Sequence, residues 1–471
     1  MIDDTIAAIA TPLGEGGLAV VRISGPAAFA VADEVFQPSG KSSLKPSAAP
    51  THTIHYGRIV RHGETVDEVL LSVLRAPRTF TREDTVEISC HGGLLPAKLV
   101  IDTILENGAR LAEPGEFTRR AFLNGRLDLA QAEAVADLIH SRTELALAAA
   151  NEQLAGKLSQ RINQLRDELI KTLAHVEAHI DFPDEDIAPE TRAQLIQRLE
   201  NGAGFMDELL RTANEGQLLR RGIRTAIIGR PNAGKSSLLN QLLGHERAIV
   251  SHIAGTTRDT IEETANIRGL PVVFIDTAGL REGRDEIEVE GIRRSRATLA
   301  RAELILHVLD ASEPLTAEDE SHLAEFAGKK RILVLNKVDL PQASVLPTSC
   351  RQKITETKFC QQDAGSTLTV EVSCLNGQGL EALKDAIKQL VWAGKIEAGM
   401  LQVMINSRHQ EALGRARTAT LETIAALRAD LSLELVALDL RIAVNAVGEI
   451  VGKTTTDDLL DSIFSQFCLG K

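Results

Sequence analysis

An eight-residue glycine loop near the middle of the chain places the strongest constraint on its fold. Residues 229–236 read G-R-P-N-A-G-K-S, which matches the phosphate-binding pattern G-x-x-x-x-G-K-[ST]. The apolar residues 225–228 before it predict a buried parallel strand, and residues 237–243 after it predict a helix. In that setting Lys235 is expected to reach the β- and γ-phosphates and Ser236 to ligate Mg²⁺. The alternative, a chance glycine turn, is disfavoured by four motifs that follow in order.

These four motifs predict that the nucleotide is GTP. Residues 255–259 (G-T-T-R-D) resemble a first switch, residues 276–279 (D-T-A-G) a second, and residues 373–375 (S-C-L) the last loop around the base. In N-K-V-D at 336–339, the carboxylate of Asp339 can accept from two donors of guanine that adenine lacks. The residues expected to contact the nucleotide are Asn232, Ala233, Gly234, Lys235, Ser236, Ser237, Ser251, Thr256, Thr257, Asp276, Gly279, Asn336, Lys337, Asp339, Ser373, Cys374 and Leu375. Ser236 and Thr257 are the expected Mg²⁺ ligands.

Composition excludes several classes of protein. The net charge of −13 is incompatible with a uniformly basic surface, so an RNA contact requires a local basic patch or a partner protein. No run of about 18 apolar residues is present, which predicts no membrane insertion. The five cysteines have no metal-ligand spacing, and the acidic start lacks the features of a signal peptide. These features predict a cytoplasmic protein without disulfides.

The pattern of expected strands and helices along the chain predicts a multidomain protein of α/β and α+β type, with three domains. Residues 1–125 alternate short strands and turns and predict an α+β domain. Residues 126–220 and 393–471 predict long helices; from Leu158 to Ile180, apolar residues recur every three or four positions. Residues 221–392 predict a Ras-like P-loop G domain with a doubly wound, mainly parallel sheet. We therefore expect the G domain to be inserted into a discontinuous helical bundle.

The chain resembles the bacterial MnmE (TrmE) family of tRNA-modification GTPases over essentially its whole length. The resemblance rests on the five GTPase motifs and on more specific stretches: A-T-P at 10–12, R-I-S-G at 22–25, H-G-G at 91–93, P-G-E-F-T at 114–118 and the final F-C-L-G-K at 467–471. It implies an N-terminal folate-binding domain and an inserted G domain that dimerises during hydrolysis. It also implies a homodimer that acts with a flavin-dependent MnmG-type partner on the wobble uridine of certain tRNAs. Nitrogen would come from glycine or ammonium, and one carbon from a tetrahydrofolate derivative (5-formyl or 5,10-methylene).

The resemblance also implies a folate site. Arg22, Glu87, Arg126 and Lys471 match the family's folate-contacting positions. A carboxylate can accept from the amino groups of a pterin, and arginines suit the folate carboxylates. Without the resemblance, each of these residues would be interpreted as a solvated surface group.

The GTPase chemistry requires a group other than glutamine to position water. The position after D-x-x-G holds Leu280, which cannot orient water, and Glu288 matches the family's water-positioning glutamate. The resemblance also implies a K⁺ ion near the phosphates in place of an arginine finger, held by Asn232, Ser251, Ile253 and Thr256. Arg258 and Arg281 are the alternative fingers. The expected catalytic residues are Glu288, Lys235 and Cys468.

The last four residues favour a functional thiol. Cys468 lies close to the end of the chain, where packing constraints are weak, and Lys471 offers a nearby cation that favours the thiolate. A prenylation box fits poorly because Gly470 and Lys471 do not suit that signal. The competing function is a regulatory GTPase of the ribosome-assembly type. We expect such a factor to carry a basic RNA-binding module, and the acidic composition indicates none.

Overall fold

The computed structural model describes residues 4–40, 44–181, 192–244, 262–275, 301–316, 319, 324, 328–340, 367–392 and 404–471, and the structural statements below refer to these residues. They belong to two compact units. Unit 1 comprises residues 1–136, 153–207 and 411–471, and unit 2 comprises residues 137–152 and 208–410. Each unit therefore joins stretches that are distant in sequence, as expected for an inserted domain. The finer three-domain boundaries stay a prediction.

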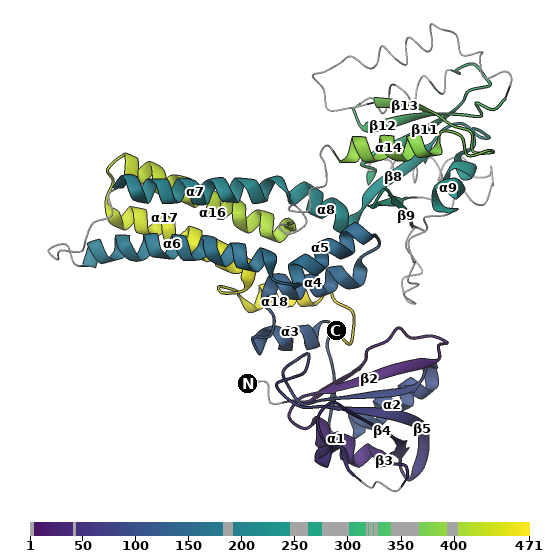
Figure 1. The fold of residues 1–471 in the computed structure, drawn as a ribbon, viewed down its shortest axis with the longest axis vertical. Helices are drawn as coiled ribbons and strands as arrows, with labels where there is room; N and C mark the ends of the chain where they lie inside the picture. The colour runs from purple at the N-terminus through teal and green to yellow at the C-terminus, as the bar shows by residue number, and fades with distance from the viewer. Residues whose placement is uncertain are drawn as a thin grey trace. The chain divides into compact units, whose positions relative to one another are not determined.

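Unit 1 begins with a seven-stranded sheet in the order β3-β4-β5-β6-β2-β1-β7 (Figure 1). Its strands are β1 (Ile6–Ile9), β2 (Leu18–Ser24), β3 (Phe36–Pro38), β4 (Thr53–Arg61), β5 (Glu64–Leu74), β6 (Thr85–His91) and β7 (Arg110–Leu111). Neighbouring strands are antiparallel except β1 with β7. Helices α1 (Ala28–Val35) and α2 (Leu94–Glu106) pack against one face and form the main core with β2, β5 and β6. The α+β prediction is confirmed; α1, β3 and β7 were not expected.

Among the described residues, the other face of this sheet is covered at the β1 end alone. There Phe117, from α3 (Glu116–Leu123), packs with Ile6, Ala8 and Ala112. Gly115 precedes α3 with a φ of +70°, and a side chain there would meet the carbonyl oxygen of Phe464 at 2.6 Å. The C-terminal part of the chain thus fixes the start of α3.

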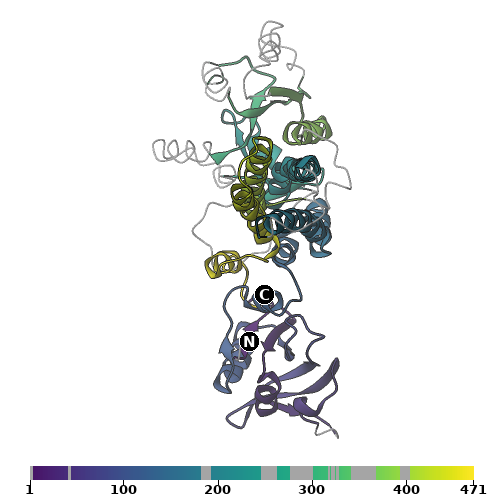
Figure 2. The same ribbon diagram turned by 90° about the vertical axis from the view of Figure 1, so that its left-hand side faces the viewer.

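The helices of unit 1 form a bundle whose members precede and follow residues 208–410. They are α6 (Lys157–Asp181), α17 (Leu433–Val451) and α18 (Asp457–Phe464), with parts of α4 (Leu129–His140), α7 (Arg192–Arg211) and α16 (Ser407–Arg428). The predicted stripe on α6 is buried at Leu158, Ile162, Leu165, Leu169 and Val176. Helix α17 packs along α6, and Figure 2 shows the two side by side from a second direction. None of the described helices combines the length and apolarity needed to cross a membrane.

Unit 2 contains the predicted doubly wound sheet, in the order β13-β12-β11-β8-β10-β9. Its elements are α5 (Glu144–Leu154, in part), α8 (Ala213–Arg221), β8 (Ile223–Ile228), α9 (Lys235–Gly244), β9 (Glu263–Ile267), β10 (Leu270–Phe274), β11 (Leu304–Asp310), β12 (Lys330–Asn336), β13 (Thr367–Glu371) and α14 (Leu380–Val391). All strands are parallel except β9, an unexpected antiparallel edge strand. The turn to β10 has a positive φ at Arg268 and Gly269, which suits a two-residue hairpin.

One residue joins the helical part of unit 2 to its sheet. Helix α8 ends at Arg221, strand β8 starts at Ile223, and Gly222 lies between them with a φ of +72°. A side chain on Gly222 would meet the carbonyl oxygen of Pro271 at 2.8 Å. This position therefore requires glycine.

A buried ionic network joins the start of the chain to α3. The guanidinium of Arg120, which has no exposed surface, donates to Asp4 Oδ1 at 2.7 Å and to Glu116 Oε1 at 3.0 Å. Arg110 also donates to Glu116 Oε1, at 2.7 Å. Burial raises the pKa of Glu116, but hydrogen bonds from Arg110, from the Glu113 N–H and from Arg120 outweigh it and leave the pKa below its ordinary value of 4.5.

We predict that Glu116→Gln destabilises unit 1 by about 2 kcal/mol at pH 7, because it removes the charge that faces buried Arg120. The ionised carboxylate of Glu116 contributes its full stability above pH 4.5, and this contribution is lost as the pH falls through the lower pKa of the folded protein. The difference between the two proteins should therefore shrink below pH 4.5. Urea unfolding followed by circular dichroism at several pH values measures this, with exposed Glu113→Gln as the control. A difference independent of pH would contradict the ionic explanation.

Candidate functional sites

The predicted P-loop follows β8, at the point where the sheet order reverses. Strand β8 pairs with β11 on one side and β10 on the other, so residues 229–234 lie at the carboxyl end of the central strand, where such sheets bind ligands. Gly229 has a φ of +145°, and a side chain there would meet the carbonyl oxygen of Val308 at 2.2 Å. Lys235 begins α9, and its ammonium donates to the carbonyl oxygens of Gly229 and Arg230 at 2.8 and 2.7 Å. This side chain therefore curves over the loop that is expected to hold the phosphates.

Asn336 connects the P-loop to the two base-recognition motifs. Its side chain donates to the carbonyl oxygen of Ala233 at 2.8 Å and accepts from the N–H of Cys374 at 3.2 Å. A side chain on Gly234 would lie 2.0 Å from Asn336 Nδ2, so this contact requires the second glycine of the motif. Burial, and then the charge of Asp339, raise the pKa of the Cys374 thiol to about 11. The structure thus brings N-K-V-D and S-C-L together beside the loop.

Several other predicted side chains of this site are exposed. Asp339, Ser236, Ser237 and Leu375 are exposed, and Leu375 is 86% exposed. Asn232 is exposed as well and has a φ of +62°. The Lys337 ammonium lies 2.5 Å from Asp310 Oδ2. Nine predicted residues lie outside the described ones: Ser251, Ile253, Thr256, Thr257, Asp276, Gly279, Glu288 and the alternative fingers Arg258 and Arg281.

One P-loop contact was not anticipated. Arg230 Nε lies 3.0 Å from Asp319 Oδ2, and Arg230 Nη1 lies 3.4 Å from Glu313 Oε2. Asp319 is fully buried. The second residue of the motif therefore joins the P-loop to the segment that follows β11. Arg230 occupies a variable position of the motif, so the motif itself does not predict this ion pair.

Arg22 and Glu87 form a pair across two strands of unit 1. They face each other in the register of β2 and β6, and Arg22 Nε donates to Glu87 Oε1 at 2.8 Å. The Arg22 guanidinium lies over the ring of Phe117, 5.6 Å from its centre. The aromatic ring was not predicted, although it belongs to the P-G-E-F-T stretch quoted above.

The end of the chain reaches the same place. The N–H of Phe117 donates to the main-chain oxygen of Lys471 at 3.2 Å, and the N–H of Gly115 donates to that of Cys468 at 3.4 Å. Gly470 has a φ of +85°, and a side chain there would meet the carbonyl oxygen of Ile9 at 2.6 Å. In both ribbon views the C mark lies beside α3. The C-x-G-K tail is therefore held against α3 and the end of β1.

Four predicted residues interact electrostatically. Burial and the charge of Arg22 lower the pKa of the Lys471 ammonium, while the charges of Glu87 and Cys468 act in the opposite direction. Cys468 itself is a free, exposed thiol. The structure thus assembles a site, here called the tail site, from Arg22, Glu87, Cys468 and Lys471.

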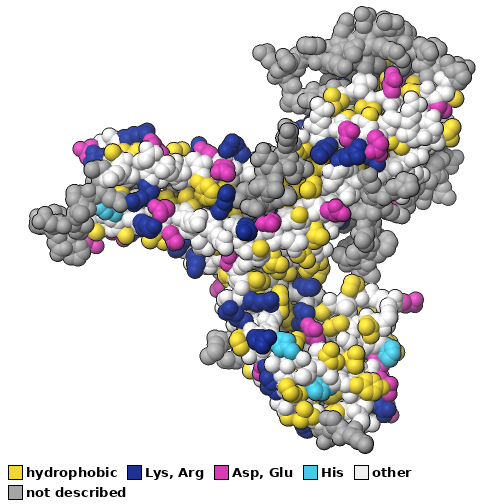
Figure 3. Space-filling view, viewed as in Figure 1, with side chains coloured by type: hydrophobic (Ala, Val, Ile, Leu, Met, Phe, Trp, Pro, Cys, Tyr) yellow, Lys and Arg dark blue, Asp and Glu magenta, His cyan; other side chains and the backbone are white. Residues whose placement is uncertain are grey.

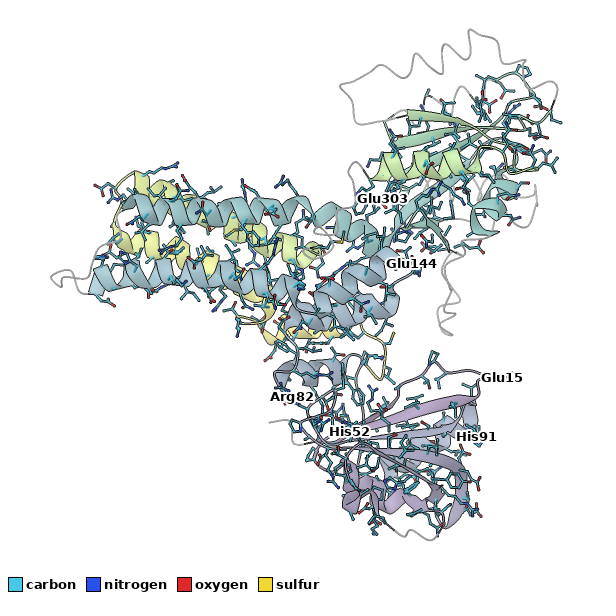
Figure 4. All side chains as sticks on the ribbon, in the orientation of Figure 1. Glu15, His52, Arg82, His91, Glu144 and Glu303 are labelled. Carbon is cyan, nitrogen blue, oxygen red and sulfur yellow. The ribbon has the colours of Figure 1, made fainter. Side chains whose placement is uncertain are left out.

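Arg126 lies apart from these four residues in its described interactions. Its guanidinium lies over the ring of Phe80, 4.8 Å from the centre, and donates to the carbonyl oxygen of Thr79 at 3.3 Å. Burial and neighbouring Arg82, labelled in Figure 4, lower its pKa. Phe80 packs against the same apolar cluster as Phe117, so Arg22 and Arg126 flank one cluster. Direct contact between Arg126 and the tail site is not among the described interactions.

Comparisons with known proteins agree with this arrangement. The description "MnmE helical domain" matches residues 129–468, and "GTP-binding protein TrmE N-terminus" matches residues 5–126. The tRNA modification GTPase MnmE of Geobacillus kaustophilus is 49% identical over 472 residues, which cover 99% of each chain. Its counterpart in Listeria innocua is 48% identical over 99% of each chain, and that of Bacillus subtilis is 46% identical over 99% of this chain and all of its own. With a P-loop G domain inserted into helices and preceded by an α+β domain, this chain is a GTPase that belongs to the MnmE (TrmE) family.

Proposed function

We propose that this GTPase modifies C5 of the wobble uridine of certain tRNAs together with a flavin-dependent MnmG-type partner, and that it takes one carbon from a tetrahydrofolate. The tail site is the observation that carries the proposal. It brings together the carboxylate of Glu87, the cations of Arg22 and Lys471, and the Cys468 thiol. These residues lie as much as 449 positions apart in the sequence. The relatives are named tRNA modification GTPases, which supports tRNA as the substrate.

The residues of the tail site fit a reduced folate. Glu87 is 30% exposed and retains acceptor capacity for the amino groups of a pterin, while Arg22 and Lys471 offer donors to carboxylates. Burial lowers the pKa of the Lys471 ammonium, and a ligand carboxylate nearby would act in the opposite direction and raise it. When bound, the folate would supply the one-carbon unit. Cys468 would act as a nucleophile or as a general acid/base at that unit.

The G domain would use Lys235 to bind the phosphates and Ser236 with Thr257 to hold Mg²⁺. Asn232 would offer its side-chain oxygen to K⁺ together with Ser251, Ile253 and Thr256, and Glu288 would position water. The exposed, positive-φ Asn232 supports this, because its amide oxygen is free to turn toward a cation beside the loop.

The uncovered sheet face supports a homodimer through the N-terminal domain. Leu18, Ile54, Tyr56 and Leu70 are between 46% and 68% exposed, and Figure 3 shows hydrophobic side chains gathered on this part of unit 1. Ile54 lies in one row with Glu87 and Arg22, because the register pairs Ile54 with Ser72, Ser72 with Glu87 and Glu87 with Arg22. The apolar face is therefore continuous with the tail site, and a second copy covering it would also close that site.

The competing proposal, a regulatory GTPase of the ribosome-assembly type, shares the nucleotide site. It gives no role to a thiol, a lysine and an Arg–Glu pair held together in unit 1. The tests below therefore distinguish the two proposals at the tail site.

Arg22→Gln should weaken the binding of 5-formyltetrahydrofolate about tenfold or more, because a charge-assisted hydrogen bond is lost. Isothermal titration calorimetry on the full-length protein measures the affinity. Lys98→Gln, a change at an exposed lysine of α2, is the matched control. Equal affinity in the wild type and Arg22→Gln would remove Arg22 from the site, and the absence of binding by the wild type would remove the folate proposal.

Cys468→Ser should abolish wobble-uridine modification in cells and leave GTP hydrolysis unchanged. The main-chain contacts of residue 468 hold the tail and do not depend on the thiol. Nucleoside analysis of tRNA from cells that carry only the variant measures the modification. Ser465→Ala, at an exposed position between α18 and the tail, is the control. Wild-type levels of modified uridine in Cys468→Ser cells would show that the thiol is not needed.

Potassium should raise kcat for GTP hydrolysis well above its value in sodium at the same ionic strength. Asn232→Gly retains the positive φ and removes the side-chain oxygen, so it should reduce the difference between the two salts. Steady-state phosphate release measures both effects. Equal wild-type rates in the two salts would contradict the cation proposal.

A further inference from the structure

A cavity of about 1240 Å³ in unit 2 is lined by basic side chains. Seven arginines and lysines line it against two glutamates, Glu262 and Glu303, in a chain whose net charge is −13. Five of these basic residues are exposed: Arg142, Arg221, Arg224, Arg301 and Lys330. A local basic patch of this kind is one of the two ways in which so acidic a chain can contact RNA, the other being a partner protein.

The cavity lies at the edge of the sheet opposite the P-loop. Arg221 ends α8 just before β8, Arg301 precedes β11, and Lys330 starts β12. These three strands are parallel and in register: Leu304 pairs with Thr225 and with Lys330. Their amino ends therefore lie together, while the P-loop and N-K-V-D follow their carboxyl ends. Figure 4 labels Glu303 near this edge. The cavity is thus a site distinct from that of GTP.

A buried donor that has no acceptor among the described residues lines the same cavity. Trp392, the single tryptophan of the chain, lines it and is 4% exposed. Its indole N–H has no hydrogen-bond partner among the described residues. A buried polar group of this kind favours a ligand that brings an acceptor oxygen.

We propose that this cavity, here called the basic cavity, binds the phosphate backbone of tRNA. Its exposed cations come from several separate stretches along one sheet edge, which suits the successive phosphates of an extended backbone. The proposal rests on tRNA being the substrate and adds the surface that holds it.

A double charge reversal tests the basic cavity. Arg221→Glu/Lys330→Glu changes two exposed lining residues, and Lys157→Glu/Lys171→Glu makes the same charge change at exposed positions of α6 in unit 1. Anisotropy of labelled tRNA, titrated with full-length protein between about 50 and 200 mM KCl, gives the affinity and its salt dependence. The cavity variant should bind about tenfold more weakly, with a slope of log affinity against log salt smaller by about two, while the control binds like the wild type. GTP hydrolysis without tRNA and the melting temperature should be unchanged in both.

The emission of Trp392 gives an independent reading of occupancy. Addition of tRNA should change this emission in the wild type and change it far less in the cavity variant. If the wild type binds tRNA and the cavity variant binds it equally well, the basic cavity is not the site. If the wild type binds no tRNA even at low salt, the proposed tRNA function itself fails. If inorganic triphosphate displaces tRNA at micromolar concentration, the cavity holds a small polyphosphate and the RNA proposal is overturned.

Discussion

The main-chain hydrogen bonds between α3 and the last residues of the chain are the contacts on which the tail site depends. The N–H groups of Gly115 and Phe117 donate to the main-chain oxygens of Cys468 and Lys471. Gly470 lies so close to the carbonyl oxygen of Ile9 that a side chain at position 470 would not fit. A terminus is normally poorly ordered unless something holds it. Here two glycines with positive φ allow the close approach. The same approach places a thiol and an ammonium beside a strand pair from the other end of the sequence.

The two candidate sites follow different physical rules. In unit 2 the parallel sheet alone gathers the loops, because the carboxyl ends of β8, β11 and β12 lie at one edge. In unit 1 the antiparallel register places Arg22 opposite Glu87, but the site is completed only by the returning tail. The first site is a property of its fold class, whereas the second depends on long-range packing. The opposite edge of the unit 2 sheet gathers charge by the same rule that gathers the nucleotide loops.

Whether a feature could be predicted depends on how far apart in sequence the residues that create it lie. The P-loop, the parallel sheet and the stripe on α6 were predicted correctly, because local periodicity and a contiguous motif encode them. The edge strand β9 was missed, since its pairing is set by the hairpin at Gly269 rather than by a distinctive apolar run. Neither the Arg230–Asp319 pair nor the position of Phe117 under Arg22 has a periodic signal. Arg22, Glu87, Cys468 and Lys471 were grouped only through the family resemblance, because residues so far apart in sequence carry no shared local pattern. The position of Arg126 beside Phe80 depends on how α3 packs, which the sequence does not reveal.

The single-residue connection at Gly222 has a consequence for the G domain. Helix α8 runs into β8 without a flexible linker, and seven residues after Gly222 the P-loop begins. A side chain at position 222 would meet Pro271 of the neighbouring strand β10, so this direct connection between α8 and β8 depends on glycine. The basic cavity therefore lies at the junction of α8 and β8, and the phosphate-binding loop lies at the other end of β8. A ligand bound in the basic cavity would contact the first residues of β8, the strand whose last residue precedes the P-loop.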